Sequence, residues 1–155
     1  FGGHMYAAGM TLKEENYQNF KKAFEKVVES TIHPDLLIPE ISVDLEIKFS
    51  AINEKFMRIL KQFEPFGPEN MTPVFMSENV VDSGYAKTLG NDAEHLKVFV
   101  KQNDSPNFNA IGFGLGKKLD VVKNKQPFDA VYIVEENEWN GKVSLQLQLR
   151  DIRAK

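Results

Sequence analysis

Residues 95–102 carry side chains that could contact a single-stranded nucleic acid. Lys97, Phe99 and Lys101 occupy every second position of this segment. The positions between them are aliphatic: Leu96, Val98 and Val100. Because side chains alternate between the two faces of a strand, we expect one aliphatic face and one basic face with a ring. Ammonium groups bind phosphates and rings stack on bases, so the second face predicts a nucleic-acid site; the alternative is an ordinary solvated face.

Lysine is concentrated near this segment, although the chain as a whole is acidic. The formal net charge is −3 at pH 7, so a bulk basic footprint is missing. Residues 97–125 nevertheless contain six lysines and only two acidic residues. By residue type and expected surface position, we predict four further nucleic-acid contacts: Phe113, Lys117, Lys118 and Trp139. The alternative is that these residues belong to the core.

Three alternating glycines in residues 112–117, Gly-Phe-Gly-Leu-Gly-Lys, could be mistaken for a nucleotide-binding loop. Their spacing matches neither the dinucleotide fingerprint nor a P-loop. Glycines at a strand more often mark a bulge or a sharp bend, which is what we expect here.

The N-terminal residues 1–9 combine glycine, alanine and one histidine, which suits close approach of the backbone to a ligand. Consecutive N–H groups of Gly2 and Gly3 could point into one concavity, and His4 could add an imidazole donor. A phosphate is therefore the ligand that this segment predicts. The alternative is a tight turn without a ligand.

The chain offers few residues for catalysis or metal binding. Its three histidines share no ligand spacing and accompany no aspartate cluster, so we predict no catalytic residue and no metal ligand.

Cysteine is absent, which excludes disulfides. No apolar run approaches the ~20 residues of a membrane span, so we expect a cytoplasmic protein without a membrane partner. Because the chain starts with Phe1 and not Met, we expect a piece of a longer protein.

Two amphipathic helices are expected in the first half of the chain. Thr11 and Glu14 match a capping box, and apolar residues recur at helical spacing to about residue 29, which predicts a helix with a core-facing stripe. A domain boundary is expected near residues 30–38. Residues 40–48 alternate as a half-buried strand, and Ser50 then suits the cap of a second helix that Pro65 ends.

The second half of the chain predicts short strands separated by turn residues. The expected strands are residues 73–82, 95–102, 108–114, 128–139 and 142–153. Asn140-Gly141 is a favoured type I′ hairpin pair between the last two. The expected fold class is α+β, with two amphipathic helices followed by a five-stranded, OB-like β-barrel.

Two segments resemble motifs of a known family. Gly-Gly-His-x-x-Ala-Ala-Gly at residues 2–9 resembles the motif of the DHH-associated domain of DHH-type phosphoesterases, and a related motif occurs in alanyl-tRNA synthetases. Residues 63–70, Phe-Glu-Pro-Phe-Gly-Pro-Glu-Asn, resemble the Pro-Phe-Gly-Pro-Gly-Asn segment of bacterial RecJ single-strand-specific exonucleases. Glu69 stands where that family usually has glycine. Because both motifs occur in the expected order, the match is specific. Residues 95–97, His-Leu-Lys, and residues 144–147, Ser-Leu-Gln-Leu, resemble further stretches of that family, so the resemblance spans nearly the whole chain.

The resemblance implies a DNA-binding portion of a larger enzyme. Residues 1–37 would end a DHH-associated domain, with Gly2, Gly3 and His4 on a substrate phosphate, and residues 38–155 would form an OB-type domain. The parent would be a 5′-to-3′ single-strand-specific DNA exonuclease of repair and recombination, with Mg²⁺ or Mn²⁺ in a DHH domain that this chain lacks. This chain alone would be inactive.

The partners implied by the resemblance are single-stranded DNA and the parent's own DHH domain, with a single-stranded-DNA-binding protein as a further candidate. The alternative from another class is a non-catalytic OB-type module that binds RNA or protein.

Overall fold

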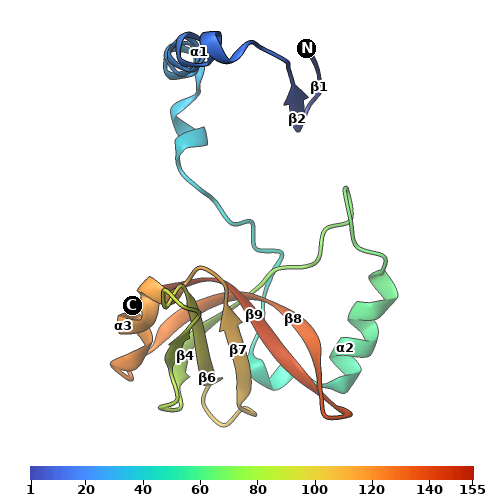
Figure 1. Cartoon of the computed structure of the whole chain (residues 1–155). Coiled ribbons are helices and arrows are strands. Elements are labelled where there is room, and N and C mark those ends of the chain that lie inside the picture. Colours follow the sequence, from blue (N-terminus) through green and yellow to red (C-terminus); the bar gives the residue numbers. More distant parts are fainter. The chain divides into compact units, whose positions relative to one another are not determined.

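The computed structural model describes residues 1–155 and divides them into two compact units, Phe1–Glu40 and Ile41–Lys155. The first unit begins with an antiparallel hairpin of β1 (Gly2–His4) and β2 (Ala7–Gly9). Helix α1 (Tyr17–Thr31) follows and is labelled in Figure 1. Short 3₁₀ turns precede and follow this helix, at Glu14–Asn16 and Pro34–Leu37.

Two expectations for the first unit are wrong. Thr11 and Glu14 form no capping box, because the 3₁₀ turn begins after Lys13 and no side chain caps it or α1. The apolar stripe of α1 is not buried: Phe24 is 56% exposed, and no residue of the unit is fully buried. A segment of about 40 residues has too little apolar surface to enclose a core of its own.

The second unit is built on a seven-stranded sheet. Its strands are β3 (Leu45–Glu46), β4 (Phe75–Asp82), β5 (Lys87–Leu89), β6 (His95–Lys101), β7 (Phe108–Gly112), β8 (Phe128–Trp139) and β9 (Lys142–Ala154). They are hydrogen-bonded in the order β3-β4-β8-β9-β7-β6-β5. Figure 1 shows the strongly curved sheet, with α3 (Leu119–Lys123) beside β4 and α2 (Glu54–Leu60) near β8. None of the helices is both long enough and apolar enough to cross a membrane.

Strand β4 pairs with three neighbours, of which β3 is parallel to it and β8 and β6 are antiparallel. It pairs with β8 through Phe75–Val80 and with β6 through Val81 and Asp82. The five predicted strands are confirmed in a mixed α/β structure with three helices. The ladder between β4 and β6 contains only two residue pairs, and a closed barrel stays a prediction.

Three local expectations for the second unit need correction. Residues 40–48 do not form a half-buried strand, since β3 contains two residues and Leu45 is 56% exposed. Ser50 does not cap α2, because it lies in the 3₁₀ turn Phe49–Ala51. The cap is Asn53, whose Oδ1 accepts a hydrogen bond of 3.0 Å from the Phe56 N–H. Strand β5 and helix α3 were not predicted.

Turn residues fix the ends of the long strands. Asn140 and Gly141 have φ angles of 50° and 73°, as a type I′ turn requires, so the predicted hairpin between β8 and β9 is confirmed. Gly112 ends β7, and Gly114 has a φ of 74° in the turn that follows. A Cβ on Gly116 would lie 1.9 Å from the Ala93 carbonyl oxygen. The glycine-rich segment is therefore a tightly packed bend, as expected.

Candidate nucleic-acid interface

Strand β6 has the two faces that its sequence predicts. Leu96, Val98 and Val100 are buried in the core. Lys97 and Lys101 are exposed, and Phe99 between them is half-buried. The alternation is maintained because β6 pairs with β7 without a register shift from Leu96 to Val100. The basic and aromatic face is therefore an outer surface of the sheet.

Phe99 lies in a surface cleft of about 440 Å³, which we call the aromatic cleft. It is lined by Tyr85, Lys87, Lys97, Val98, Phe99 and Asn109. The rings of Tyr85 and Phe99 meet edge to face, with centroids 6.2 Å apart and planes at 82°. Tyr85 is 72% exposed. The cleft thus offers two aromatic surfaces and two ammonium groups to one ligand.

The two lysines of the aromatic cleft lie directly opposite each other on adjacent strands. Lys87 of β5 is the register partner of Lys97 of β6. Like charges directly opposite each other destabilise a strand pair. The ion pairs of the structure involve other lysines, so no carboxylate neutralises either group. An anionic ligand would relieve this repulsion.

Asp82 fixes the loop that carries Tyr85. Its Oδ2 accepts hydrogen bonds from the N–H groups of Gly84 at 2.7 Å and Ala86 at 3.2 Å. Its Oδ1 accepts one from the Phe99 N–H at 3.2 Å. The nearly buried carboxylate thereby joins the loop on both sides of Tyr85 to the strand of Phe99. Asp82 is a positioning residue for the aromatic pair.

The outer face continues from β6 onto the β8–β9 hairpin. Phe99, Asn109, Gln146 and Glu135 are successive register partners across β6, β7, β9 and β8. Gln146 Nε2 donates a hydrogen bond of 2.8 Å to Glu135 Oε1. The next row is buried, which assigns this row to the outside: Val98, Ala110, Leu147 and Val134.

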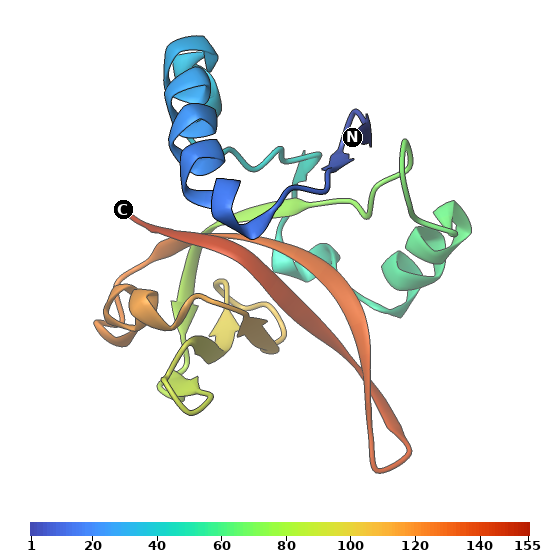
Figure 2. The ribbon, with the colours of Figure 1, turned by 45° about the horizontal axis from the view of Figure 1, so that its top comes forward.

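Trp139 belongs to the same outer face, because it lies four residues beyond Glu135 on β8. It is 74% exposed, and its register partner is Lys142. Figure 2 shows the hairpin extending beyond the rest of the sheet. Trp139 is therefore an exposed aromatic residue at the hairpin end of the same outer face that contains the aromatic cleft.

The remaining predicted contacts of the second unit lie outside the aromatic cleft. Phe113 is exposed and meets the His95 ring edge to face at a centroid distance of 5.2 Å. Lys117 is exposed in a 3₁₀ turn. Lys118 forms an ion pair with Asp151 and donates to the Ile152 carbonyl at 2.9 Å, so its ammonium group has a structural role. Nucleic-acid contacts by these three residues stay predictions.

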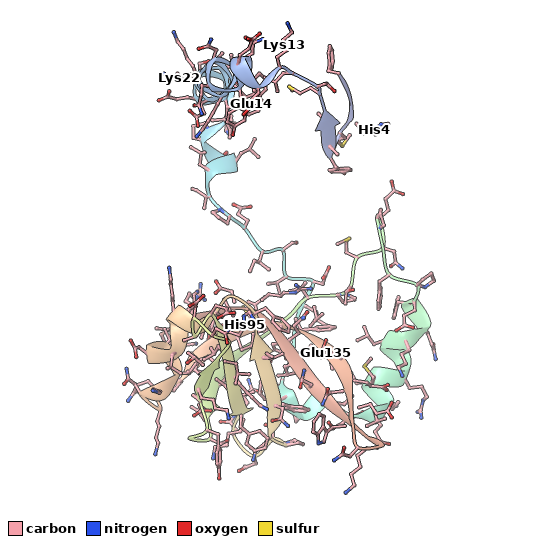
Figure 3. The ribbon with its side chains drawn as sticks, viewed as in Figure 1. His4, Lys13, Glu14, Lys22, His95 and Glu135 are labelled. Carbon is pink, nitrogen blue, oxygen red and sulfur yellow. The ribbon has the colours of Figure 1, made fainter.

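Gly2, Gly3 and His4 form β1 of the N-terminal hairpin (Figure 3). A Cβ on Gly3 would lie 3.0 Å from the Ala8 Cβ, so the close approach is to the second strand. In extended backbone successive N–H groups point to opposite sides, so the two glycines form no concavity here. The His4 side chain is exposed. Phosphate binding by this segment stays a prediction.

Sequence reasoning missed Tyr85, Lys87 and Asn109. Asn109 could have been found, because it is the exposed position of an alternating strand. Tyr85 and Lys87 gave no such signal, since Tyr85 precedes β5 and β5 contains only three residues, too few for alternation to show. A metal site is not built here, because no three His, Asp or Glu side chains are close enough to hold an ion.

The five long strands and their order are those of an OB domain, a class of small β domain in which the face of the second and third strands can bind oligonucleotides or oligosaccharides. The RecJ OB domain family model matches residues 43–151. The chain therefore belongs to the RecJ OB domain family, and the resemblance inferred from its motifs is confirmed.

Relatives and solved structures agree with this assignment. The chain is 29% identical to the single-stranded-DNA-specific exonuclease RecJ of Bacillus subtilis over 97% of this chain and 19% of the relative. It is 26% identical to that of Escherichia coli over 98% of this chain and 26% of the relative. The crystal structure of RecJ from Thermus thermophilus with Mn²⁺ shares the fold, with a TM-score of 0.71 and 23% identity over 99% of this chain and 22% of that one. The chain spans about a fifth to a quarter of its curated relatives.

Proposed function

We propose that this chain is the single-stranded-DNA-binding, C-terminal portion of a cytoplasmic RecJ-like exonuclease that acts 5′ to 3′ in DNA repair and recombination. The observation that carries the proposal is the aromatic cleft, in which the Tyr85 and Phe99 rings lie beside Lys87 and Lys97. Bases of a single strand are free to stack on such rings, and lysines bind the phosphates between them. In a duplex the bases are already stacked, which favours single-stranded DNA.

The chain's role in the reaction is to hold the strand. It has no group of His, Asp and Glu side chains that fits a metal ion, so no hydrolytic step is assigned to its residues. We assign cleavage to a DHH domain of the parent, where Mg²⁺ or Mn²⁺ would activate water and stabilise the leaving group. Crystal structures of RecJ with Mn²⁺ and with Mg²⁺ support this assignment.

We assign the first unit to the end of the DHH-associated domain. On this proposal Gly2, Gly3 and His4 contact a substrate phosphate, and the parent's DHH domain is the principal protein partner. A single-stranded-DNA-binding protein is a further candidate partner. These assignments rest on the resemblance of residues 2–9 and on the relatives' names.

Direct binding measurements test the proposal. Fluorescence anisotropy of labelled single-stranded DNA, the same sequence as a duplex and the same sequence as RNA would be compared over a range of salt concentrations. We expect the single-stranded DNA to bind most tightly, with an affinity that falls as salt rises because counterions are released. Tighter binding of RNA, or no nucleic-acid binding at all, would favour the alternative of a module for RNA or protein.

A further inference from the structure

A second cleft of about 410 Å³ lies at the end of β6; we call it the lysine cleft. Its lining residues are Val81, Asp82, Ser83, Lys101, Asn107 and Lys125. Lys101 and Lys125 take part in no ion pair of the structure, because the ion pairs involve other lysines. The one acidic lining group, Asp82, already accepts three backbone hydrogen bonds. The cleft is therefore lined by two lysines that form no ion pair and by one carboxylate that already accepts hydrogen bonds from the backbone.

The lysine cleft continues the aromatic cleft. Each cleft is lined by the chain around β4 to β5, by β6 and by the chain around β7. Lys101 follows Phe99 on the outer face of β6 and is the register partner of Val81. Ser83 is adjacent to Phe99, since its N–H donates to the Phe99 carbonyl at 2.7 Å. A strand that leaves the aromatic cleft along β6 therefore enters the lysine cleft.

Ser83 supplies an independent sign of a ligand. Its Oγ is buried and has no hydrogen-bond partner in the protein. A buried hydroxyl without a partner destabilises the fold, and nearly all such groups are paired. Ser83 is one of the residues that line the cleft with Lys101 and Lys125, so a rotation of its side chain would bring the hydroxyl to an oxygen of a bound anion.

We propose that the lysine cleft binds a backbone phosphate of the strand whose bases occupy the aromatic cleft. Lys101 and Lys125 neutralise this phosphate, and Ser83 Oγ donates a hydrogen bond to it. The assignment rests on the proposed function and adds a direction: the strand follows β6 toward the loop before β7 and the loop that carries Lys125. Binding should therefore strengthen when an oligonucleotide becomes long enough to reach both clefts.

A length series tests the site with Lys125→Ala. Affinities of the whole chain for oligothymidylates of increasing length would be measured against salt. Short oligonucleotides should bind the variant and the parent equally, whereas for longer ones the slope of log affinity against log salt should flatten by about 0.7 in the variant. Lys123→Ala is the matched control, since Lys123 is exposed on α3 and lines neither cleft.

Ser83→Ala separates a ligand contact from a structural role. The hydroxyl has no protein partner to lose, so the melting temperature should not fall. Affinity for long oligothymidylates should weaken by about tenfold, because the substitution removes a hydrogen bond to a charged oxygen.

The outcomes distinguish this inference from the proposed function. If the parent binds but Lys125→Ala matches Lys123→Ala at every length, the phosphate site is wrong and the proposed function stands. If Ser83→Ala binds long oligothymidylates as the parent does, its hydroxyl does not contact the phosphate. If the parent binds no single-stranded DNA, both proposals fail.

Discussion

Glu69 adopts a backbone conformation that suits glycine, with a φ of 66°. It lies in a turn closed by two hydrogen bonds between Gly67 and Asn70, of 2.9 and 3.0 Å. A residue with a Cβ costs roughly 1–2 kcal/mol in this left-handed region, and the RecJ pattern has glycine at this position. We expect Glu69→Gly to raise the free energy of unfolding by up to about 1 kcal/mol in urea denaturation.

Glu64 provides the matched control for this prediction. It is exposed, five residues earlier, and its φ is −66°. Glu64→Gly should lower the free energy of unfolding by about 0.5–1 kcal/mol, because glycine loses more conformational entropy on folding. Equal destabilisation by the two variants would contradict the strain assigned to Glu69.

Asp129 makes stability depend on pH. Burial raises the pKa of this carboxyl, but the Arg153 guanidinium, the Asn79 N–H and Lys155 together hold the pKa below its ordinary value. Arg153 donates to Asp129 Oδ2 at 3.0 Å. A lowered folded-state pKa stabilises the fold above the unfolded pKa of ~3.9, and this stability is lost as pH falls through the folded value.

Asp129→Asn should therefore lower the free energy of unfolding by about 1–3 kcal/mol at pH 7. The difference from the parent should shrink as the pH falls below ~3.9, since the parent's carboxyl also becomes neutral. Thermal melts at several pH values measure it, with Asp104→Asn as a control at an exposed residue outside the ion pairs. A difference that is independent of pH would refute the assignment.

At the scale of single residues, the sequence predicts contacts that depend on local alternation and misses those that depend on tertiary pairing. Lys97, Phe99 and Lys101 could be grouped because they alternate on one strand. Tyr85 reaches Phe99 only because Asp82 folds its loop onto β6. The engagement of Lys118 by Asp151 joins residues 33 positions apart, which no local pattern indicates.

At the scale of elements, the β8–β9 hairpin depends on Gly141. Glycine readily adopts the φ of 73° that is found here, and no atom would contact a Cβ added at this position. Gly141→Ala should therefore destabilise only through backbone strain, by about 1–2 kcal/mol in urea denaturation. Gly67→Ala is the control, since Gly67 also has open space but no positive φ. Equal effects of the two substitutions would argue against the type I′ turn.

Strands were predictable from the sequence where an alternating segment pairs with a neighbouring strand along most of its length. Strands β6, β8 and β9 pair along most of their length, so most of their apolar positions are buried as expected, although Val143 near the hairpin turn is 60% exposed. Residues 40–48 alternate equally well, but only Leu45 and Glu46 pair with β4. Alternation in the sequence shows that one side of a segment is apolar, but it does not show whether a neighbouring strand pairs with that segment. Helix α3 was missed because five residues are too short for a helical period to show.

At the scale of the whole molecule, core and candidate site occupy opposite faces of one sheet. Every buried apolar residue lies between Phe49 and Ile152, within the second unit. The side chains of Lys97 and Lys101 are on the outer face and make no ion pair. Their local positive charge favours the proposed binding of an anionic strand, although the net charge of the chain is −3. Changes on this face should spare the fold.

The most direct measurement compares salt dependence and affinity for single-stranded DNA among outer-face variants. Lys97→Ala combined with Lys101→Ala should flatten the slope of log affinity against log salt by about 0.7 for each phosphate-binding lysine that is removed. Phe99→Ala should weaken binding by about 1–3 kcal/mol with the slope unchanged, because it removes stacking and no cation. The control is Lys55→Ala combined with Lys123→Ala, two exposed lysines outside both clefts. If the outer-face variants fold normally and bind with the parent's affinity and slope, the strand does not bind on β6 and the account is wrong.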